Sequence, residues 1–265
     1  MTPPDLWEWR LGQSPVIAAA IHNGHRLRPE VARLMLLDEA ARLREEDPYT
    51  GEWTTLSDNC IVVHLSRFEV DLNRSRGEAV YIEPADAWGL KIWKTRPPRD
   101  VIERSLAEYN SFYAKLSSML KRLERRLGRF VVYDMHSYNH RRGEPGSPCG
   151  EPATHPDVNV GTGSLDRVRW APVVDRFIRE LGSYDFLGRR LDVRENVKFF
   201  GRQFARWIHG HFPASACVLA IDVKKFFMDE WTGIPDANAL KAVGKALALT
   251  VPGVLEELSR LHGMH

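Results

Sequence analysis

Short apolar segments alternate with longer amphipathic ones along this chain of 265 residues. The short segments are bounded by polar or turn residues, and two of them are rich in valine and isoleucine. This pattern predicts buried strands at residues 16–21, 61–65, 130–133 and 217–221. Because such strands are apolar on both faces, they favour a mostly parallel sheet that is covered on both sides.

Amphipathic helices are predicted between these strands. The clearest one covers residues 100–127, where apolar side chains recur every three or four positions, with Asp100 as N-cap and Gly128 after the last turn. Further helices are predicted over residues 29–43, 168–181, 201–211 and 237–261. The alternation indicates an α/β fold of three layers. Since no repeat or linker divides the chain, we expect a single domain over residues 1–265.

Composition narrows the class of protein. Hydrophobic residues make up 43% of the chain and charged residues 27%, which is typical of a globular protein. No apolar run approaches the roughly 20 residues of a membrane span, and the N-terminus lacks a signal-peptide pattern, so we expect a soluble, cytoplasmic protein. The net charge of +2 does not indicate nucleic-acid binding, and the three cysteines lack metal-site spacing. The pattern leaves the oligomeric state open.

Polar and ionisable residues follow each of the four predicted strands. His22 follows the first, Arg67 the second, His136 the third and Asp222 the fourth. Because ligands bind beyond the carboxyl ends of the strands in open α/β sheets, we expect these residues to converge on one edge. Two histidines and one carboxylate are a common ligand set for catalytic zinc, whose fourth position is left for water.

The carboxylate of such a set is expected from the acidic run of residues 45–47. A run of this kind at a helix end is usually solvated, but Pro48 fixes the turn that follows it and suits a side chain aimed at a site. The pattern leaves Glu46 and Asp47 as alternatives. Asp47 is slightly favoured because it immediately precedes the proline.

Six segments carry a family pattern. They are residues 22–24 (His-Asn-Gly), 46–50 (Glu-Asp-Pro-Tyr-Thr), 67–74 (Arg followed by Asp-Leu-Asn-Arg), 134–137 (Asp-Met-His-Ser), 156–162 and 222–230. In this order they resemble the N-formylglutamate amidohydrolases, which are related to zinc carboxypeptidases and to the aspartoacylase/succinylglutamate desuccinylase group. The resemblance implies a three-layer α/β/α fold of the zinc-exopeptidase (phosphorylase/hydrolase-like) type, with a mixed, mostly parallel sheet.

The same resemblance implies an activity. It points to a hydrolase that cleaves the amide bond of a small N-acyl amino acid, of N-formyl type, or of a related carboxylated amide. One zinc ion per chain would be held by His22, His136 and either Glu46 or Asp47, and would activate the attacking water. A carboxypeptidase-like metallopeptidase is one alternative. A metal-binding protein of the same fold that has lost catalysis and serves a binding or regulatory role is the other.

Asp222 stands where the family has a catalytic glutamate. Its expected role is to take a proton from the attacking water and to pass it to the leaving amine. Aspartate is one methylene shorter than glutamate, and a misplacement of about 1 Å can cost roughly 100-fold in rate. Either the backbone compensates or the activity differs from that of the family. A salt bridge with Lys224, Lys225 or a nearby arginine is the structural alternative for this residue.

Substrate binding is expected to depend on arginine, whose planar fork suits a carboxylate. Asn73 and Arg74 resemble the asparagine-arginine pair that anchors a carboxylate in the related carboxypeptidases. Arg67 and Arg74 can also supply positive charge to the developing oxyanion. Of the two, Arg74 is assigned to catalysis and Arg67 to substrate binding. Arg202, which follows Gly201 at a predicted helix start, is a further anchor.

The remaining histidines and two tryptophans complete the set of candidates. His25, three residues after His22, is a weaker candidate for a donor behind the ligands or an extra ligand. Trp88 and Trp93 are candidates for the pocket wall. His64 is predicted to lie in a strand as a core residue. Loop or helix-surface positions are predicted for His140, His155, His209 and His211.

Overall fold

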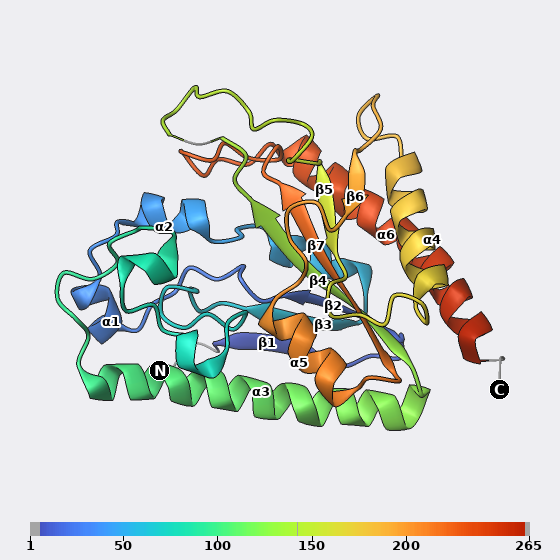
Figure 1. Ribbon diagram of the computed structural model, residues 1–265, viewed down its shortest axis with the longest axis horizontal. Coiled ribbons are helices and arrows are strands. Elements are labelled where there is room, and N and C mark those ends of the chain that lie inside the picture. The colour runs from blue at the N-terminus through green and yellow to red at the C-terminus, as the bar shows by residue number, and fades with distance from the viewer. Residues whose placement is uncertain (1–5, 142, 263–265) are drawn as a thin grey trace.

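The computed structural model describes residues 6–141 and 143–262, and in it a seven-stranded sheet lies between helices (Figure 1). The strand order is β1-β3-β2-β4-β7-β5-β6. Neighbours are antiparallel in the β1–β3 and β5–β7 pairs and parallel in the other four, so the expectation of a mixed, mostly parallel sheet is confirmed. The strands are β1 (Trp7–Arg10), β2 (Val16–Ala20), β3 (Asn59–Val63), β4 (Phe130–Tyr138), β5 (Val158–Gly161), β6 (Val193–Glu195) and β7 (Ala216–Lys224).

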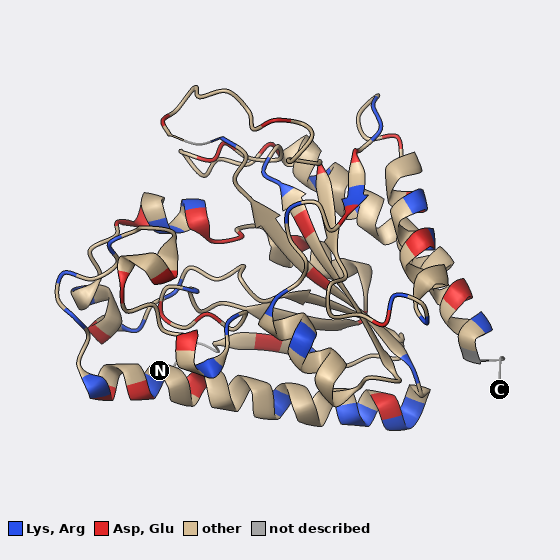
Figure 2. Cartoon of the chain, viewed as in Figure 1, with Lys and Arg blue, Asp and Glu red and all other residues tan. Residues whose placement is uncertain are grey.

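The α-helices surround this sheet. They are α1 (Pro29–Leu34), α2 (Glu39–Glu45), α3 (Arg99–Leu127), α4 (Ala171–Ser183), α5 (Gln203–His211) and α6 (Ala237–His262). Short 3₁₀ helices are η1 (Thr50–Leu56), η2 (Arg76–Glu78) and η3 (Pro84–Ala87). Basic and acidic residues are interspersed along α3 (Figure 2), which fits a solvated helix face rather than a basic binding surface. Within the described residues, no helix is both long and apolar enough to cross a membrane.

Successive side chains of the central strands point to opposite faces of the sheet, so each face has its own hydrophobic core. In β4, Val131 and Tyr133 pack with α4 and α6, whereas Phe130 and Val132 pack with α3 and α5. This is the period-two pattern of a strand that is buried on both sides. The α/β/α layering follows directly from it (Figure 1).

Two details of the predicted helices are wrong. Residues 29–43 form two helices, because the chain leaves helical geometry at Met35, which forms an antiparallel bridge with Trp93. The second helix, α2, restarts where the Asp38 side chain accepts a hydrogen bond from the Ala41 N–H. In α3 the N-cap position is Pro98, not Asp100, which lies instead in the first turn, where its charge still favours the helix N-terminus.

The central strands run further than their apolar cores predict. β4 continues to Tyr138 and β7 to Lys224, and the two remain paired along this whole length. Most of the added residues are polar, and the extension places His136 of β4 opposite Asp222 of β7. This extension carries the polar ends of two central strands to one edge of the sheet.

Candidate active site

Polar residues from three adjacent strands form a row at this edge. His136 on β4 is the register partner of Asp222 on β7, which is also the partner of Asn159 on β5. Cross-strand partners project to the same face of a sheet, so the three side chains lie side by side. The Asn159 side-chain N–H donates to Asp222 Oδ2 at 3.4 Å.

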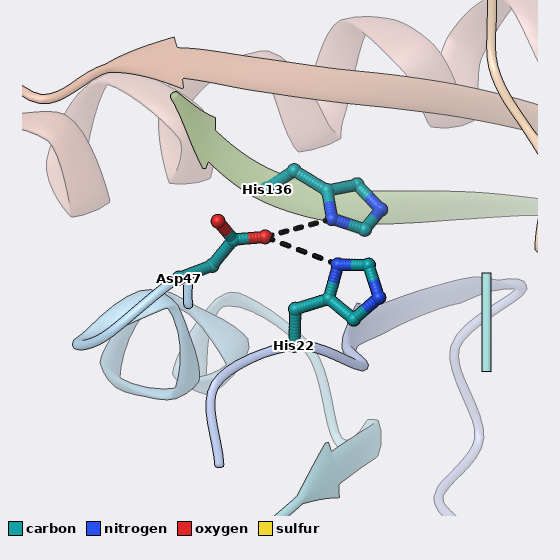
Figure 3. Close-up of side chains that lie close together, drawn as sticks. All are labelled: His22, Asp47 and His136. Atoms are coloured by element: carbon teal, nitrogen blue, oxygen red, sulfur yellow. Dashed lines mark hydrogen bonds and ion pairs between the residues drawn. The ribbon is translucent and has the colours of Figure 1, made fainter. Parts of the chain in front are cut away.

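His22, Asp47 and His136 converge at one end of this row (Figure 3). Asp47 Oδ2 lies 3.4 Å from His22 Nδ1 and 3.0 Å from His136 Nδ1. One ligand atom from each residue lies within 4.8 Å of the other two, and all three residues are buried. A buried set of two imidazole nitrogens and one carboxylate oxygen has the chemistry and spacing to hold a metal ion such as zinc.

A second carboxylate lies behind each of the two histidines. His22 Nε2 is 2.7 Å from Asp71 Oδ1, and His136 Nε2 is 3.0 Å from Asp134 Oδ1. A carboxylate at Nε2 favours the tautomer that carries its proton there, which leaves the Nδ1 lone pair for a cation. Both Nδ1 atoms face Asp47, so the orientation of the two rings suits a shared metal ion.

The structure distinguishes between the two acidic candidates. Asp47 faces the histidines, and the Ser137 hydroxyl donates to its Oδ1 at 3.2 Å. Glu46 points elsewhere: it accepts a hydrogen bond from Ser66 and contacts His25 Nδ1. The structure therefore brings neither Glu46 nor His25 to the cluster, because consecutive residues in this extended turn face opposite ways.

The charges of the cluster are strongly coupled. Burial acts against ionisation of Asp47, but hydrogen bonds from His136 and His22 hold the pKa of its carboxyl well below the usual value. Burial also opposes protonation of His136, yet the carboxylates of Asp134 and Asp47 raise its pKa well above the usual value. These carboxylates thus create a local preference for positive charge.

Asp222 differs from its acidic neighbours. Burial, together with the nearby charges of Asp47 and Asp134, raises the pKa of its carboxyl to about 7 against the opposing effect of His136. The two lysines considered as its partners are engaged elsewhere. Lys224 pairs with Asp157, and the Lys225 ammonium donates to backbone carbonyls, one of them that of Glu46. The alternative of a salt bridge from Asp222 to one of these lysines or to an arginine is therefore not seen among the described residues.

A cavity of about 340 Å³ opens on this edge of the sheet. It is lined by Asp222 and by His22, Asp47 and His136, which are called the metal-type cluster below. Arg67, Asn73, Arg202 and Trp88, all predicted from the sequence, also line it. Two other candidates are not among its lining residues, namely Arg74 and Trp93. The Trp93 indole is buried and donates to the Tyr81 carbonyl at 2.6 Å.

Comparisons with known proteins place this geometry in a family. The family model for N-formylglutamate amidohydrolase matches residues 14–225. The chain belongs to this family. The match includes every residue of the metal-type cluster, Asp222 and the predicted arginines, and membership identifies the chain as a hydrolase of the amidohydrolase type.

Solved structures support the fold. A crystal structure of N-formylglutamate amidohydrolase from Ralstonia eutropha JMP134 superposes with a TM-score of 0.71 at 16% identity, covering 96% of this chain and 98% of that chain. A gene product of Agrobacterium tumefaciens gives a TM-score of 0.66 at 14% identity, with 92% of each chain covered. At these identities the likeness shows the fold alone. A search of curated proteins returned no match.

The arginines that the family pattern suggests are held in different ways. Arg74 lies outside the cavity because Asp86 O accepts from its guanidinium at 3.3 Å and its Nε lies 3.9 Å from Asp71. By contrast, the Arg202 guanidinium lines the cavity and has no acceptor among the described residues. Burial and the neighbouring charges of Arg74 and Arg67 lower the pKa of Arg202.

Sequence reasoning missed several residues of the site. It assigned no role in the site to Asp71, Asp134 or Asn159. Asp71 and Asp134 stand inside the family's Asp-Leu-Asn-Arg and Asp-Met-His-Ser segments, which is the signal that could have identified them. Tyr81 carries no such signal, because its contact with Asp71 depends on the path of the intervening loop.

His140 lies in a loop and His209 on a helix, as predicted, but neither is fully exposed, and the predicted place of His64 inside a strand is wrong. His140 is buried, and its Nε2 lies 3.4 Å from Glu230. His209 is half-buried against β7, where its Nε2 accepts a hydrogen bond from the Val218 N–H at 3.0 Å. His64 follows the last residue of β3 rather than lying inside it.

Proposed function

We propose that this chain is a zinc-dependent amidohydrolase that cleaves the amide bond of a small N-acyl amino acid of N-formyl type or of a related carboxylated amide. The observation that carries the proposal is the buried His22–Asp47–His136 cluster, which shares a cavity with Asp222 and Arg202. Among the described residues, Arg202 has no anionic partner within salt-bridge distance. Together they provide a cation site, a proton acceptor and a carboxylate anchor.

His22, Asp47 and His136 would hold the metal. The donor set fits zinc because a carboxylate lies behind each imidazole and Asp47 accepts a hydrogen bond from Ser137. When bound, zinc supplies Lewis acidity to the scissile carbonyl and to water, whose pKa it can lower to about 7.

Asp222 is assigned the proton transfers. It lies beside His136 in the sheet and lines the cavity, so its carboxylate is placed to accept a proton from the attacking water. It then donates this proton to the amide nitrogen, which leaves as a neutral amine while the acyl carbon becomes a carboxylic acid. Its position on a paired strand, rather than on a loop, gives it a fixed reach.

Two arginines share the recognition of the substrate. Asp71, Tyr81 and the Glu45 carbonyl occupy most of the N–H groups of Arg67, so Arg67 is suited to a single oxygen such as the scissile carbonyl. Arg202 has its fork free and is suited to a substrate carboxylate. This role, first assigned to Arg74, therefore passes to Arg202.

The size of the cavity favours a small amide over a peptide. Its volume of about 340 Å³ is near the lower end of the roughly 300–1,000 Å³ typical of small-molecule sites. An N-acyl amino acid fits such a space, whereas a peptide would need an open groove on one side.

A substrate screen with metal control tests the proposal. Metal is removed with a chelator and zinc is added back, while hydrolysis of N-formyl, N-acetyl and N-succinyl amino acids is followed. We expect hydrolysis of at least one of these classes only in the zinc-loaded protein. Hydrolysis that is unchanged in metal-free protein, or zinc-loaded protein that cleaves peptides but none of these amides, would overturn it.

A further inference from the structure

Trp88 has an unusual backbone for a large side chain. Its φ of 55° and ψ of 24° lie in the left-handed region, which bulky residues rarely adopt. The glycine that would suit this conformation is the next residue, Gly89, which also has a positive φ of 94°. A strained residue of this kind persists only where the surrounding structure holds it, and such residues gather at functional sites.

The turn that carries Trp88 is held from both sides. The carboxylate of Asp86 accepts from the backbone N–H groups of Ile82 and Glu83 at 2.9 Å each. The Pro84 carbonyl accepts from the Gly89 N–H at 2.8 Å. The strain at Trp88 is therefore supported by the turn itself, and its half-exposed indole lines the cavity.

The Trp88 ring covers the guanidinium of Arg67. The Arg67 Cζ atom lies 4.9 Å from the indole centroid, within the range of a cation–π contact. The Tyr81 ring stands edge-on to the same indole, with centroids 6.1 Å apart. Trp88 thus covers the guanidinium, and Tyr81 packs against the Trp88 ring in a T-shaped contact.

Tyr81 also fixes the donors of Arg67. The Tyr81 hydroxyl accepts from Arg67 Nε at 3.3 Å and from Nη2 at 3.2 Å, and it donates its own proton to Asp71. Arg67 Nη2 donates further to Asp71 at 2.8 Å, and Nη1 donates to the Glu45 carbonyl at 3.3 Å. Since a guanidinium has five N–H donors, one N–H, on Nη1, stays available.

We propose that Trp88 and Tyr81 are positioning residues, which together hold the Arg67 guanidinium so that a single N–H faces the substrate carbonyl. This inference rests on the proposed function for its chemical purpose. The groups around Arg67 form a clamp, which consists of the Trp88 indole face, the Tyr81 phenol oxygen, the Asp71 carboxylate and the Glu45 carbonyl. This clamp is a receptor for a guanidinium ion. That receptor can be tested without turnover.

The kinetic test compares Trp88→Ala with Trp88→Phe on an N-acyl amino acid that the wild type hydrolyses. We expect Trp88→Ala to lower kcat by roughly 10- to 100-fold through misplacement of Arg67, with KM little changed because Arg202 binds the carboxylate. Trp88→Phe keeps an aromatic face and should restore most of kcat. Trp231→Ala is the matched control, since it removes the Trp231–Arg44 stack and leaves Arg67 in place.

The binding test uses guanidinium chloride at low millimolar concentration against sodium chloride of equal ionic strength. We expect guanidinium to raise the melting temperature of Arg67→Ala and to restore part of its activity. Neither effect should occur in Arg67→Ala/Trp88→Ala. Should Arg67→Ala not fold, the kinetic test still decides, because Trp88 is half-exposed and its replacement is tolerated more easily.

The two tests separate the clamp from the proposed function. If the wild type hydrolyses no N-acyl amino acid, the proposed function fails, while guanidinium binding still decides whether the clamp exists. Equal kcat in wild type and Trp88→Ala, or equal guanidinium binding with and without Trp88, would overturn the clamp. Loss of kcat in both Trp88→Ala and Trp88→Phe at normal metal content would also contradict it.

Discussion

Two histidines beside β7 show how surroundings decide what a buried imidazole can do. His136 lies between the carboxylates of Asp134 and Asp47, which raise its pKa well above the usual value despite burial. His209 accepts a hydrogen bond from a backbone N–H and contacts the Ser164 hydroxyl, and burial lowers its pKa to about 4. His136 is buried and His209 half-buried, so burial alone would lower both pKa values, and the carboxylates account for the opposite shift at His136. His136 is equipped to bind a cation, whereas His209 is a neutral structural residue.

The contrast between His136 and His209 is tested most strongly by replacing each residue in turn. We expect His136→Ala to lose the metal and to lower hydrolysis by roughly 1,000-fold or more, because the metal supplies several kcal/mol of transition-state stabilisation. His209→Ala should lower stability but keep one metal ion per chain. Metal content by elemental analysis, with activity on the same preparations, distinguishes the two. Normal metal content in His136→Ala would contradict the assigned site.

Replacement of Asp222 separates the holding of the metal from the chemistry. Asp222 lies next to His136 in the sheet but outside the cluster, so Asp222→Asn should retain the metal. Its kcat should fall by roughly 100- to 10,000-fold, the range typical of a lost general base. An unchanged kcat in Asp222→Asn would mean that another group moves the proton.

A pair of arginine variants tests the rim of the cavity. Arg202→Met should raise KM by roughly 10- to 100-fold, which corresponds to the loss of a charge-assisted hydrogen bond. Arg74→Met should change KM much less, because Arg74 is held by Asp71 and by the Asp86 carbonyl outside the cavity. A larger effect from Arg74 would restore the assignment first made from the family pattern.

The smallest expected effect concerns the pH dependence of stability. His209 binds a proton less readily in the folded state, at a pKa of about 4, than in the unfolded chain, at about 6.5. Its contribution is therefore complete above pH 6.5 and is lost as pH falls towards 4, by about 1 to 2 kcal/mol between pH 7 and pH 5. Urea unfolding of wild type and His209→Gln at both values measures it. An equal loss in both proteins would show that His209 titrates normally.

The parts of the fold that could be predicted from the sequence are those with a clear hydrophobic pattern. The apolar cores of β2, β3, β4 and β7 were each found, because burial on both faces leaves a continuous apolar run. β1 was missed because it is an edge strand whose residues are half or fully exposed. β5 and β6 were missed because they are short, and they are kept in place by their partners rather than by their own pattern.

The candidate site could be predicted only in part, because some of its residues are placed by contacts that the local sequence does not show. Position after a strand was enough to single out His22, His136 and Asp222. The choice between Glu46 and Asp47 required the turn to be seen, since adjacent residues point in opposite directions. The distinction between Arg74 and Arg202 depends on contacts between distant segments, which no local pattern records.

The central claim is that His22, Asp47 and His136 hold one metal ion that hydrolysis requires. The most direct measurement is a zinc titration of the chelator-treated protein, with bound metal and hydrolysis of an N-acyl amino acid followed together. The account predicts that both rise in proportion and saturate at one ion per chain, with Asp47→Asn impaired and Glu46→Gln binding normally. Hydrolysis independent of zinc, or zinc binding that persists in Asp47→Asn and fails in Glu46→Gln, would contradict it.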